Sequence, residues 1–230
     1  MSWSVFSILL LLITLGLFLQ VPFVQNWLVD KVTRTLSEKT NFRTEIGTIQ
    51  LSWWDAVTLE KVQVFDQQDS LMIGAEQLYA DFSIASLLAP GDPQLDHIRV
   101  EKARIHLINH SGDSTLNINR WVAALGKAFG STTTKAPTAR FFINSLELRQ
   151  TIFAYTNLQA APVTEGWDYN RMEWTELNAN ATDFRLDGSN LEIAVDNLSG
   201  KERFTGLQVN QLKTQLQYSP EALELKNLDL

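Results

Sequence analysis

From Phe42 to the end of the chain, apolar and polar residues alternate with a period of two, and this alternation constrains the fold more than any other feature. It is clearest in the stretches TEIGTIQLSWW, VTLEKVQVFD and AEQLYADFSIASLL, and polar connectors such as QQDS, NHSGDS and RLDGSN separate the runs. Strands separated by turn residues at this spacing are typical of an antiparallel meander. The sequence therefore predicts a mainly β fold with one continuous apolar face. That face must be covered by a second layer, curl on itself or hold an apolar ligand.

Four of the alternating runs slip by one residue before the alternation resumes. They are LEKVQV (59–64), IRVEKARIHL (98–107), NSLELRQTIFAY (144–155) and LQVNQLKTQLQY (207–218). Either a tight turn or a β-bulge produces such a slip, and the sequence leaves both open. We expect the slip at 101–103 to place His97 and His106 in different strands.

The first 24 residues predict a membrane anchor. The stretch from Trp3 to Val24 has no charged residue and is long enough for a helix that crosses a hydrocarbon core of roughly 30 Å. It does not end in a small-x-small cleavage site, so we predict an uncleaved transmembrane helix at 1–24 rather than a signal peptide. No Lys or Arg precedes it, and charge alone leaves the topology open.

An amphipathic helix is predicted at 25–41, with Pro22 near its start and Asn41 at its end. The residues of its apolar stripe are Val24, Trp27, Leu28, Val32 and Leu36. The stripe could pack against the rest of the domain, or the helix could lie against a bilayer or close the end of a cavity.

One further helix is predicted at 118–129, with Gly130 as its stop. The following Ser, Thr, Pro and Ala residues at 131–139 have no apolar period and predict a linker. We therefore divide the β region into segments at 42–130 and 140–230.

Residues that could carry chemistry are few. The chain has no Cys, and its three histidines, His97, His106 and His110, have acidic neighbours at Asp96, Glu101 and Asp113 but no spacing that predicts a metal site. We find no phosphate-binding loop and no nucleophile motif. The sequence thus predicts no catalytic residue, cofactor or metal, and not an enzyme. A net charge of −7 with 19 scattered Lys and Arg residues disfavours a nucleic-acid partner.

A family resemblance rests on the order of these patterns. The apolar span, then VQNWLVDKVTRTLSEKTNFRTEIGTIQLSWW and LDHIRVEKARIHLINHSGDSTLNI, resembles the N-terminal part of the AsmA-like proteins, in particular the TamB-type translocation and assembly module. NSLELRQTIFAYTN and the stretch from WDYNRMEW to the end are similar to the continuation in such proteins from Bacteroidota. The resemblance covers nearly the whole chain and depends on apolar and turn patterns. The basic leader usual in the family is absent.

The resemblance implies an elongated, curled, mostly antiparallel sheet that forms a taco-like groove. It also implies a single-pass anchor in the bacterial inner membrane, with the bulk of the protein in the periplasm. The implied function is to conduct phospholipid between the inner and outer membranes. The alternative is a structural module for outer-membrane protein insertion or secretion that carries no lipid.

The implied partners are the inner membrane, phospholipid acyl chains and an outer-membrane barrel protein. Because family members are longer, we expect the chain to be an N-terminal fragment, with the barrel partner bound by a region beyond Leu230. That expectation accounts for an alternation that is still running at the last residue. Strict alternation puts Leu78, Ala80, Phe82 and Ile84 on one face, and these residues are candidates to line the groove. Ile105 and Leu107 are further candidates.

Overall fold

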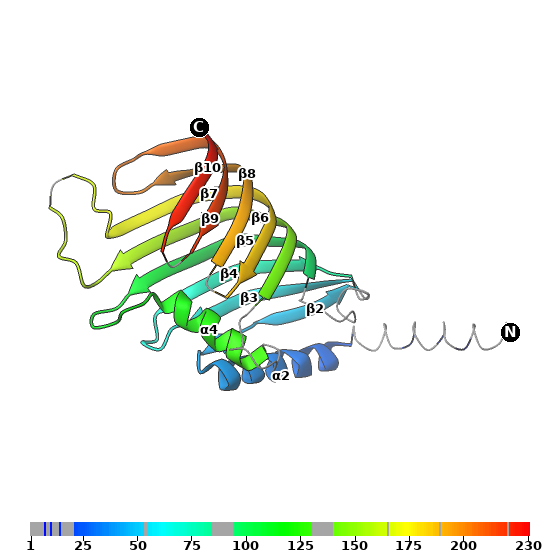
Figure 1. Ribbon diagram of the computed structural model, residues 1–230. Coiled ribbons are helices and arrows are strands. Elements are labelled where there is room, and N and C mark those ends of the chain that lie inside the picture. Colours follow the sequence, from blue (N-terminus) through cyan, green and yellow to red (C-terminus); the bar gives the residue numbers. More distant parts are fainter. Residues whose placement is uncertain are drawn as a thin grey trace.

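The computed structural model describes residues 7, 10, 14, 21–52, 55–83, 94–129, 140–164, 166–188, 190–219 and 221–230. Helix α2 (Pro22–Thr40) precedes the strands, and helix α4 (Asn117–Phe129) lies between β5 and β6 in the chain. Figure 1 shows the strands side by side in one sheet, with both helices near its β1 end. The strands are β1 (Thr44–Glu45), β2 (Thr48–Ser52), β3 (Ala56–Phe65), β4 (Leu71–Asp81), β5 (Gln94–Asn109), β6 (Arg140–Asn157), β7 (Arg171–Asp187), β8 (Asn190–Glu202), β9 (Gln208–Tyr218) and β10 (Leu223–Asp229).

The sheet follows the order of the chain almost throughout. Its strand order is β1-β3-β4-β5-β6-β7-β8-β9-β10, and β2 also pairs with β3. All neighbours are antiparallel except β5 and β6, which run parallel from Gln94 opposite Phe142 to Asn109 opposite Asn157. A parallel pair needs a crossover connection, and the segment that contains α4 supplies it. One sheet therefore runs across the two predicted β segments.

Several strands bend at the same level of the sheet. Lys61 in β3, Lys102 in β5 and Gln150 in β6 have φ angles of 54°, 49° and 51°, which lie in the left-handed region. Lys102 lies beside Gln150 and also beside Glu76 of β4, to which its Nζ is bonded at 3.0 Å. Three of the predicted phase slips are thus bends inside continuous strands, and none of these three is a chain-reversing turn.

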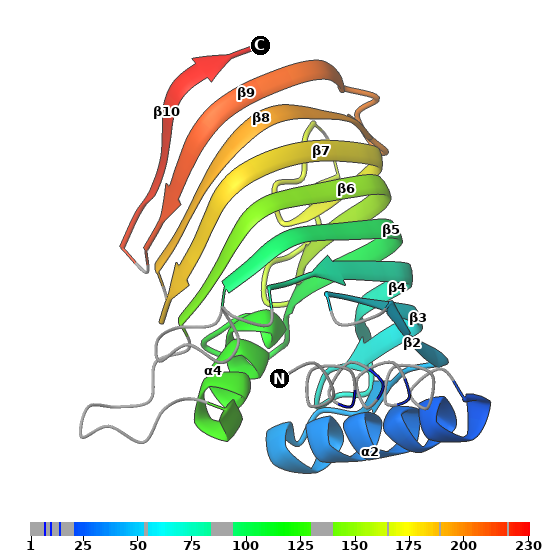
Figure 2. The same cartoon turned by 90° about the vertical axis from the view of Figure 1, so that its right-hand side faces the viewer.

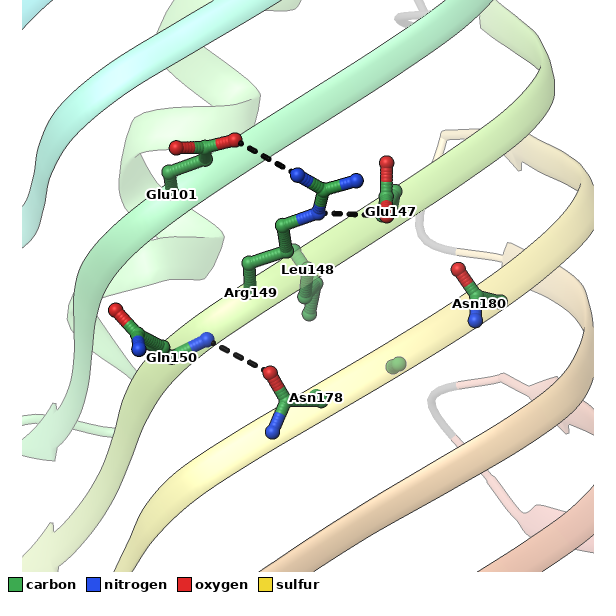
Figure 3. A pocket seen from close by; sticks show the side chains of 8 residues that line it. Glu101, Glu147, Leu148, Arg149, Gln150, Asn178 and Asn180 are labelled. Carbon is green, nitrogen blue, oxygen red and sulfur yellow. Dashed lines mark hydrogen bonds and ion pairs between the residues drawn. The ribbon is translucent and has the colours of Figure 1, made fainter.

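The bend changes which side chains share a face. Figure 3 shows Arg149 and the next residue, Gln150, on the near side of the sheet, with Leu148 on the far side. Two consecutive residues on one side shift the alternation by one, so apolar residues stay on the same face above and below the bend. Figures 1 and 2 show the strands arched in a common direction. The far face of Figure 3 is the concave face, because paired outward side chains belong to the outside of a bend.

In the part of the chain that the structure describes, a cluster of buried apolar side chains lies at the helical end of the molecule. Phe42, Val64 and Met72 are 2%, 4% and 0% exposed and make up the buried hydrophobic cluster. Side chains of β4 and α4 pack around it: Ile73, Ile118, Trp121 and Ala124. Helix α2 contacts β1, β2 and α4, while α4 contacts the end of β5. The helices therefore cover one end of the sheet.

The prediction of an N-terminal transmembrane helix is not supported. Within the described ranges, no helix is both long and apolar enough to span a bilayer. The last residues of the predicted span, Pro22 to Val24, form the first turn of α2, which carries five charged residues further along. Most of 1–20 lies outside the described residues. The fold class is corrected on this point, and the localisation as a single-pass inner-membrane protein, which depended on that helix, is corrected with it.

The other helix predictions can be compared directly with the structure. Helix α2 starts at Pro22, three residues before the predicted start, and is capped by Asn41 with a φ of 57°. Helix α4 begins one residue before the predicted 118 and ends at 129. Gly130 and the predicted linker at 131–139 lie outside the described residues.

Candidate functional site

Apolar side chains form a continuous row across the concave face. Residues that pair directly on neighbouring strands have their side chains on the same face. One such row runs through seven strands, from β3 to β9, just above the bend. We call it the apolar ladder: Leu59, Leu78, Val100, Leu148, Ala179, Leu198 and Leu212.

Two parallel rows widen this face. Above the ladder, a second row consists of Val57, Ala80, Ile98, Leu146, Ala181 and Val195. Below the bend, a third row consists of Val64, Ile73, Ile105, Phe153 and Trp174. The concave face is therefore apolar on both limbs of the arch.

The large side chains of the ladder are only partly buried. Leu78, Val100, Leu148 and Leu198 are all of intermediate exposure. The alanines of the concave face are more enclosed, with Ala75, Ala80, Ala103, Ala179 and Ala181 between 3% and 8% exposed. Substantial contacts between strands in the described part of the chain occur only between sheet neighbours, so these residues have no second sheet packed over them.

Four of the six candidate groove residues lie in these strands. Leu78 is in the ladder, and Ala80 and Ile105 are in the adjoining rows. Leu107, in β5, pairs with Tyr155 of β6 and is two residues beyond Ile105. Phe82 follows the end of β4, and its backbone N–H donates to the carbonyl of Asp55 at 2.7 Å. Ile84 lies outside the described residues.

The convex face carries charged and polar side chains at the matching positions. A shallow depression of about 440 Å³ lies over β5, β6 and β7, lined in part by Glu101, Glu147, Arg149 and Asn178 (Figure 3). Glu147 accepts hydrogen bonds of 2.7 Å from Arg99 and from Arg149, and these bonds hold its pKa below the usual value. Arg149 also pairs with Glu101 at 3.3 Å. Because these charges are paired with one another, the depression offers no uncompensated charge to a ligand.

A buried polar cluster connects α4 to the sheet. Asp66, in the turn after β3, is 5% exposed, and its Oδ2 lies 2.7 Å from Nε2 of His110 and 3.2 Å from Nδ2 of Asn117. Its Oδ1 accepts from the N–H groups of Gln68 and Ser70. Burial acts to raise the pKa of Asp66, but the hydrogen bonds outweigh it and lower the pKa. The carboxylate thus joins the β3–β4 turn, the end of β5 and the start of α4.

The histidines do not form a metal site among the described residues, in which no group of three or more potential ligands comes together. The expectation that His97 and His106 belong to different strands is wrong, since both lie in β5. His97 contacts Ser145 at 3.2 Å, and His106 contacts Thr156 at 2.9 Å. Burial, reinforced by nearby Arg104, lowers the pKa of His106.

The five residues of the predicted apolar stripe of α2 differ in their burial. Val24 is buried, and Leu28, Val32 and Leu36 are partly buried. Trp27 is 56% exposed, so it lies away from the side of the helix that the other four residues share. In a helix, Trp27 lies one turn from Phe23, which is 79% exposed.

Sequence reasoning missed the Asp66 cluster and the exposed aromatic pair on α2. The turn composition of DQQDS could have indicated an aspartate that accepts backbone hydrogen bonds. The spacing of Phe23 and Trp27 was also available in the sequence. The sequence does not indicate that Asp66 contacts His110 and Asn117, because these two residues come from the end of β5 and the start of α4, far along the chain.

A scan against models of known protein families finds no match, and a search of curated proteins finds none either.

Proposed function

We propose that the concave apolar face binds phospholipid acyl chains and that the protein conducts phospholipid between membranes. The observation that supports this function is the apolar ladder, whose large side chains remain partly exposed and have no second sheet over them. A contiguous apolar patch that is exposed to solvent is typical of a site that binds an apolar ligand or partner.

The dimensions of the ladder suit acyl chains. Seven strands have six spacings of about 4.8 Å, so the ladder is about 29 Å long. One leaflet of a hydrocarbon core is about 15 Å thick, so the ladder exceeds the depth that acyl chains occupy in a leaflet. Each methylene that moves from water to this face contributes about 0.8 kcal/mol.

The family resemblance supports the same proposal. A curled sheet with an apolar trough is what the resemblance to the AsmA-like, TamB-type proteins implies, and lipid transport toward an outer membrane is the function it suggests. An outer-membrane barrel partner belongs to this proposal as well.

Site-specific photo-crosslinking tests the proposal. A photo-reactive amino acid at Leu148, on the concave face, should capture phospholipid in cells. The same amino acid at Asn180, the exposed residue that follows Ala179 in β7, should capture none, because it lies on the convex face and points away from the ladder.

The crosslinks also separate lipid binding from a dry structural role. If the concave face only packs against protein, Leu148 crosslinks will contain peptide and no lipid. That result, or equal lipid capture at Leu148 and Asn180, would reject the proposed function.

A further inference from the structure

Helix α4 packs against one end of the concave apolar face. Its residues Ile118, Trp121 and Ala124 are three apart, which places them on one side of the helix. This side packs against the buried hydrophobic cluster that includes Val64. Val64 is also the β3 residue of the third row, on the lower limb of the arch. The helix therefore covers part of the same apolar face that carries the ladder.

The exposure of the side chains in β3 shows how far this cover extends. Val64 is 4% exposed, whereas Leu59 in the ladder and Val57 in the row above it are partly exposed on the same face of the same strand. Further along the third row, Ile105 and Phe153 are partly exposed as well. The cover therefore occupies the lower limb at β3 and leaves the upper limb of that strand open.

Polar contacts fix the start of α4 beside this end of the face. Asn117, the first residue of the helix, is 3% exposed and donates to Asp66 at 3.2 Å and to the backbone carbonyl of His106 at 3.1 Å. Arg120, in the first turn, pairs with Asp113. Among the described residues, α4 has no substantial contact with β6 or with any later strand. The helix is therefore held at the first strands and does not extend over the rest of the third row.

We propose that α4 competes with acyl chains for the lower limb of the concave face, so that lipid on this limb ends at the helix while lipid on the ladder reaches β3. An apolar side chain and an acyl chain are stabilised by the same removal of apolar surface from water, and close packing lets only one of them occupy a given site. Ile118 and Trp121 then determine where the lipid path ends. This inference rests on the proposed function, because a competitor needs a lipid to exclude. Figure 2 shows α4 at the end of the sheet where β3 and β4 lie.

The rate of cysteine modification measures both the cover and the lipid in the full chain, which has no native Cys. Val64→Cys lies at the covered end, and Leu59→Cys, on the same face of the same strand, is its matched control. A water-soluble maleimide should modify Val64→Cys about tenfold more slowly than Leu59→Cys, because the covered position reacts only when the structure opens locally. Lysophosphatidylcholine should slow the modification of Leu59→Cys by about fivefold and leave that of Val64→Cys unchanged.

Variants of α4 test the competition itself. Trp121→Ala removes the largest side chain of the covering side, so Val64→Cys should react about fivefold faster and should become protected by lysophosphatidylcholine. Ala124→Arg places a charge on the same side and should have the same effect. Ala123→Arg, at an exposed position of the helix, is the matched control and should change neither the rate nor the protection. Circular dichroism shows whether each variant keeps its sheet.

The outcomes separate this inference from the proposed function. Equal lipid protection of Val64→Cys and Leu59→Cys in the otherwise unchanged chain would overturn the competition and retain lipid binding, and this comparison holds even if an α4 variant fails to fold. Folded Trp121→Ala and Ala124→Arg variants in which the lipid still does not protect Val64→Cys would overturn it too.

A third position on the ladder completes the test. Protection of Leu148→Cys without protection of Leu59→Cys would overturn the competition, because the lipid would then stop short of β3 on both limbs. If lysophosphatidylcholine protects neither Leu148→Cys nor Leu59→Cys, the proposed function fails, and the competition fails with it.

Discussion

Asp66 is the residue whose contacts connect the most distant parts of the fold. Its carboxylate accepts from the side chains of His110 and Asn117 and from two backbone N–H groups, and Asn117 in turn accepts from the N–H of Ile108 at 3.1 Å. No other described interaction joins the β3–β4 turn to α4 through a buried charge. The attachment of α4 therefore depends on the ionised form of Asp66.

Asp66→Asn should destabilise the protein by about 3 kcal/mol at pH 7, because the new amide places a donor against His110 and Asn117. The pKa of Asp66 is lowered on folding, so the unfolded chain binds more protons than the folded one and stability decreases as the pH is lowered. This contribution is complete above the ordinary carboxyl pKa of about 4 and is lost as the pH falls below it. Urea unfolding at pH 7 and pH 3 measures both effects.

Asp69→Asn, in the same turn, is the control. Asp69 has a side chain that is 77% exposed and a φ of 62°, a conformation that Asn tolerates. Its free energy of unfolding should change by less than about 0.5 kcal/mol. A similar loss for both variants, or an Asp66→Asn variant whose stability deficit is the same at pH 3 as at pH 7, would contradict this role of Asp66.

At this scale, sequence patterns predict which residues of one strand share a face more readily than which residues contact distant partners. Alternation placed Leu78, Ala80 and Ile105 on one face, because side-chain direction in a strand follows from position alone. It could not place Asp66 with His110, since that pairing depends on how β5 and α4 return to the β3–β4 turn.

Among the elements, the bent strands show how local backbone geometry preserves the apolar face. A side chain at positive φ costs about 1 kcal/mol or more, and β-branched residues tolerate it least. Lys61, Lys102 and Gln150 have this unfavourable conformation in the sheet. The slip in the apolar pattern located these positions in the sequence, but it could not distinguish a bend from a turn.

Gln150→Val should destabilise the sheet by about 1–2 kcal/mol, because valine is strained at a φ of 51°. Gln150→Gly should be neutral or slightly stabilising. Asn180→Val is the control, because Asn180 is an exposed strand residue that does not have a positive φ angle. This substitution should change stability by less than about 0.5 kcal/mol. Thermal unfolding of the three variants tests the bend. Equal stability of Gln150→Val and Gln150→Gly would show that it is not conformationally demanding.

Helix α2 allows a similar comparison between its two faces. Leu28→Asp should destabilise the fold by about 2–3 kcal/mol, since it removes a packed side chain and places a charge against apolar neighbours. Arg34→Asp, on the exposed face, should have little effect. Limited proteolysis of the two variants measures the difference. Equal resistance would mean that the stripe of α2 packs against nothing.

For the whole molecule, the arrangement of the strands decides what the apolar face can do. The sequence predicted a mostly antiparallel sheet from its turn spacing, but the parallel pairing of β5 with β6 joins residues about 48 positions apart. Such a pairing leaves no periodic signal. The ladder is a property of this register, because a shift of one residue between two strands would place polar side chains within it.

The central claim about function is that the apolar ladder binds phospholipid. Measuring the lipid that stays with the purified protein tests this claim most directly. Mass spectrometry should find phospholipid with the wild-type chain and with Asn180→Arg, whose new side chain lies on the convex face. Leu148→Arg should stay folded by circular dichroism, because a long side chain at a partly exposed position can extend to solvent, yet it should lose most of its lipid. A wild-type chain without phospholipid, or a Leu148→Arg variant that carries as much as the wild type, would contradict the account.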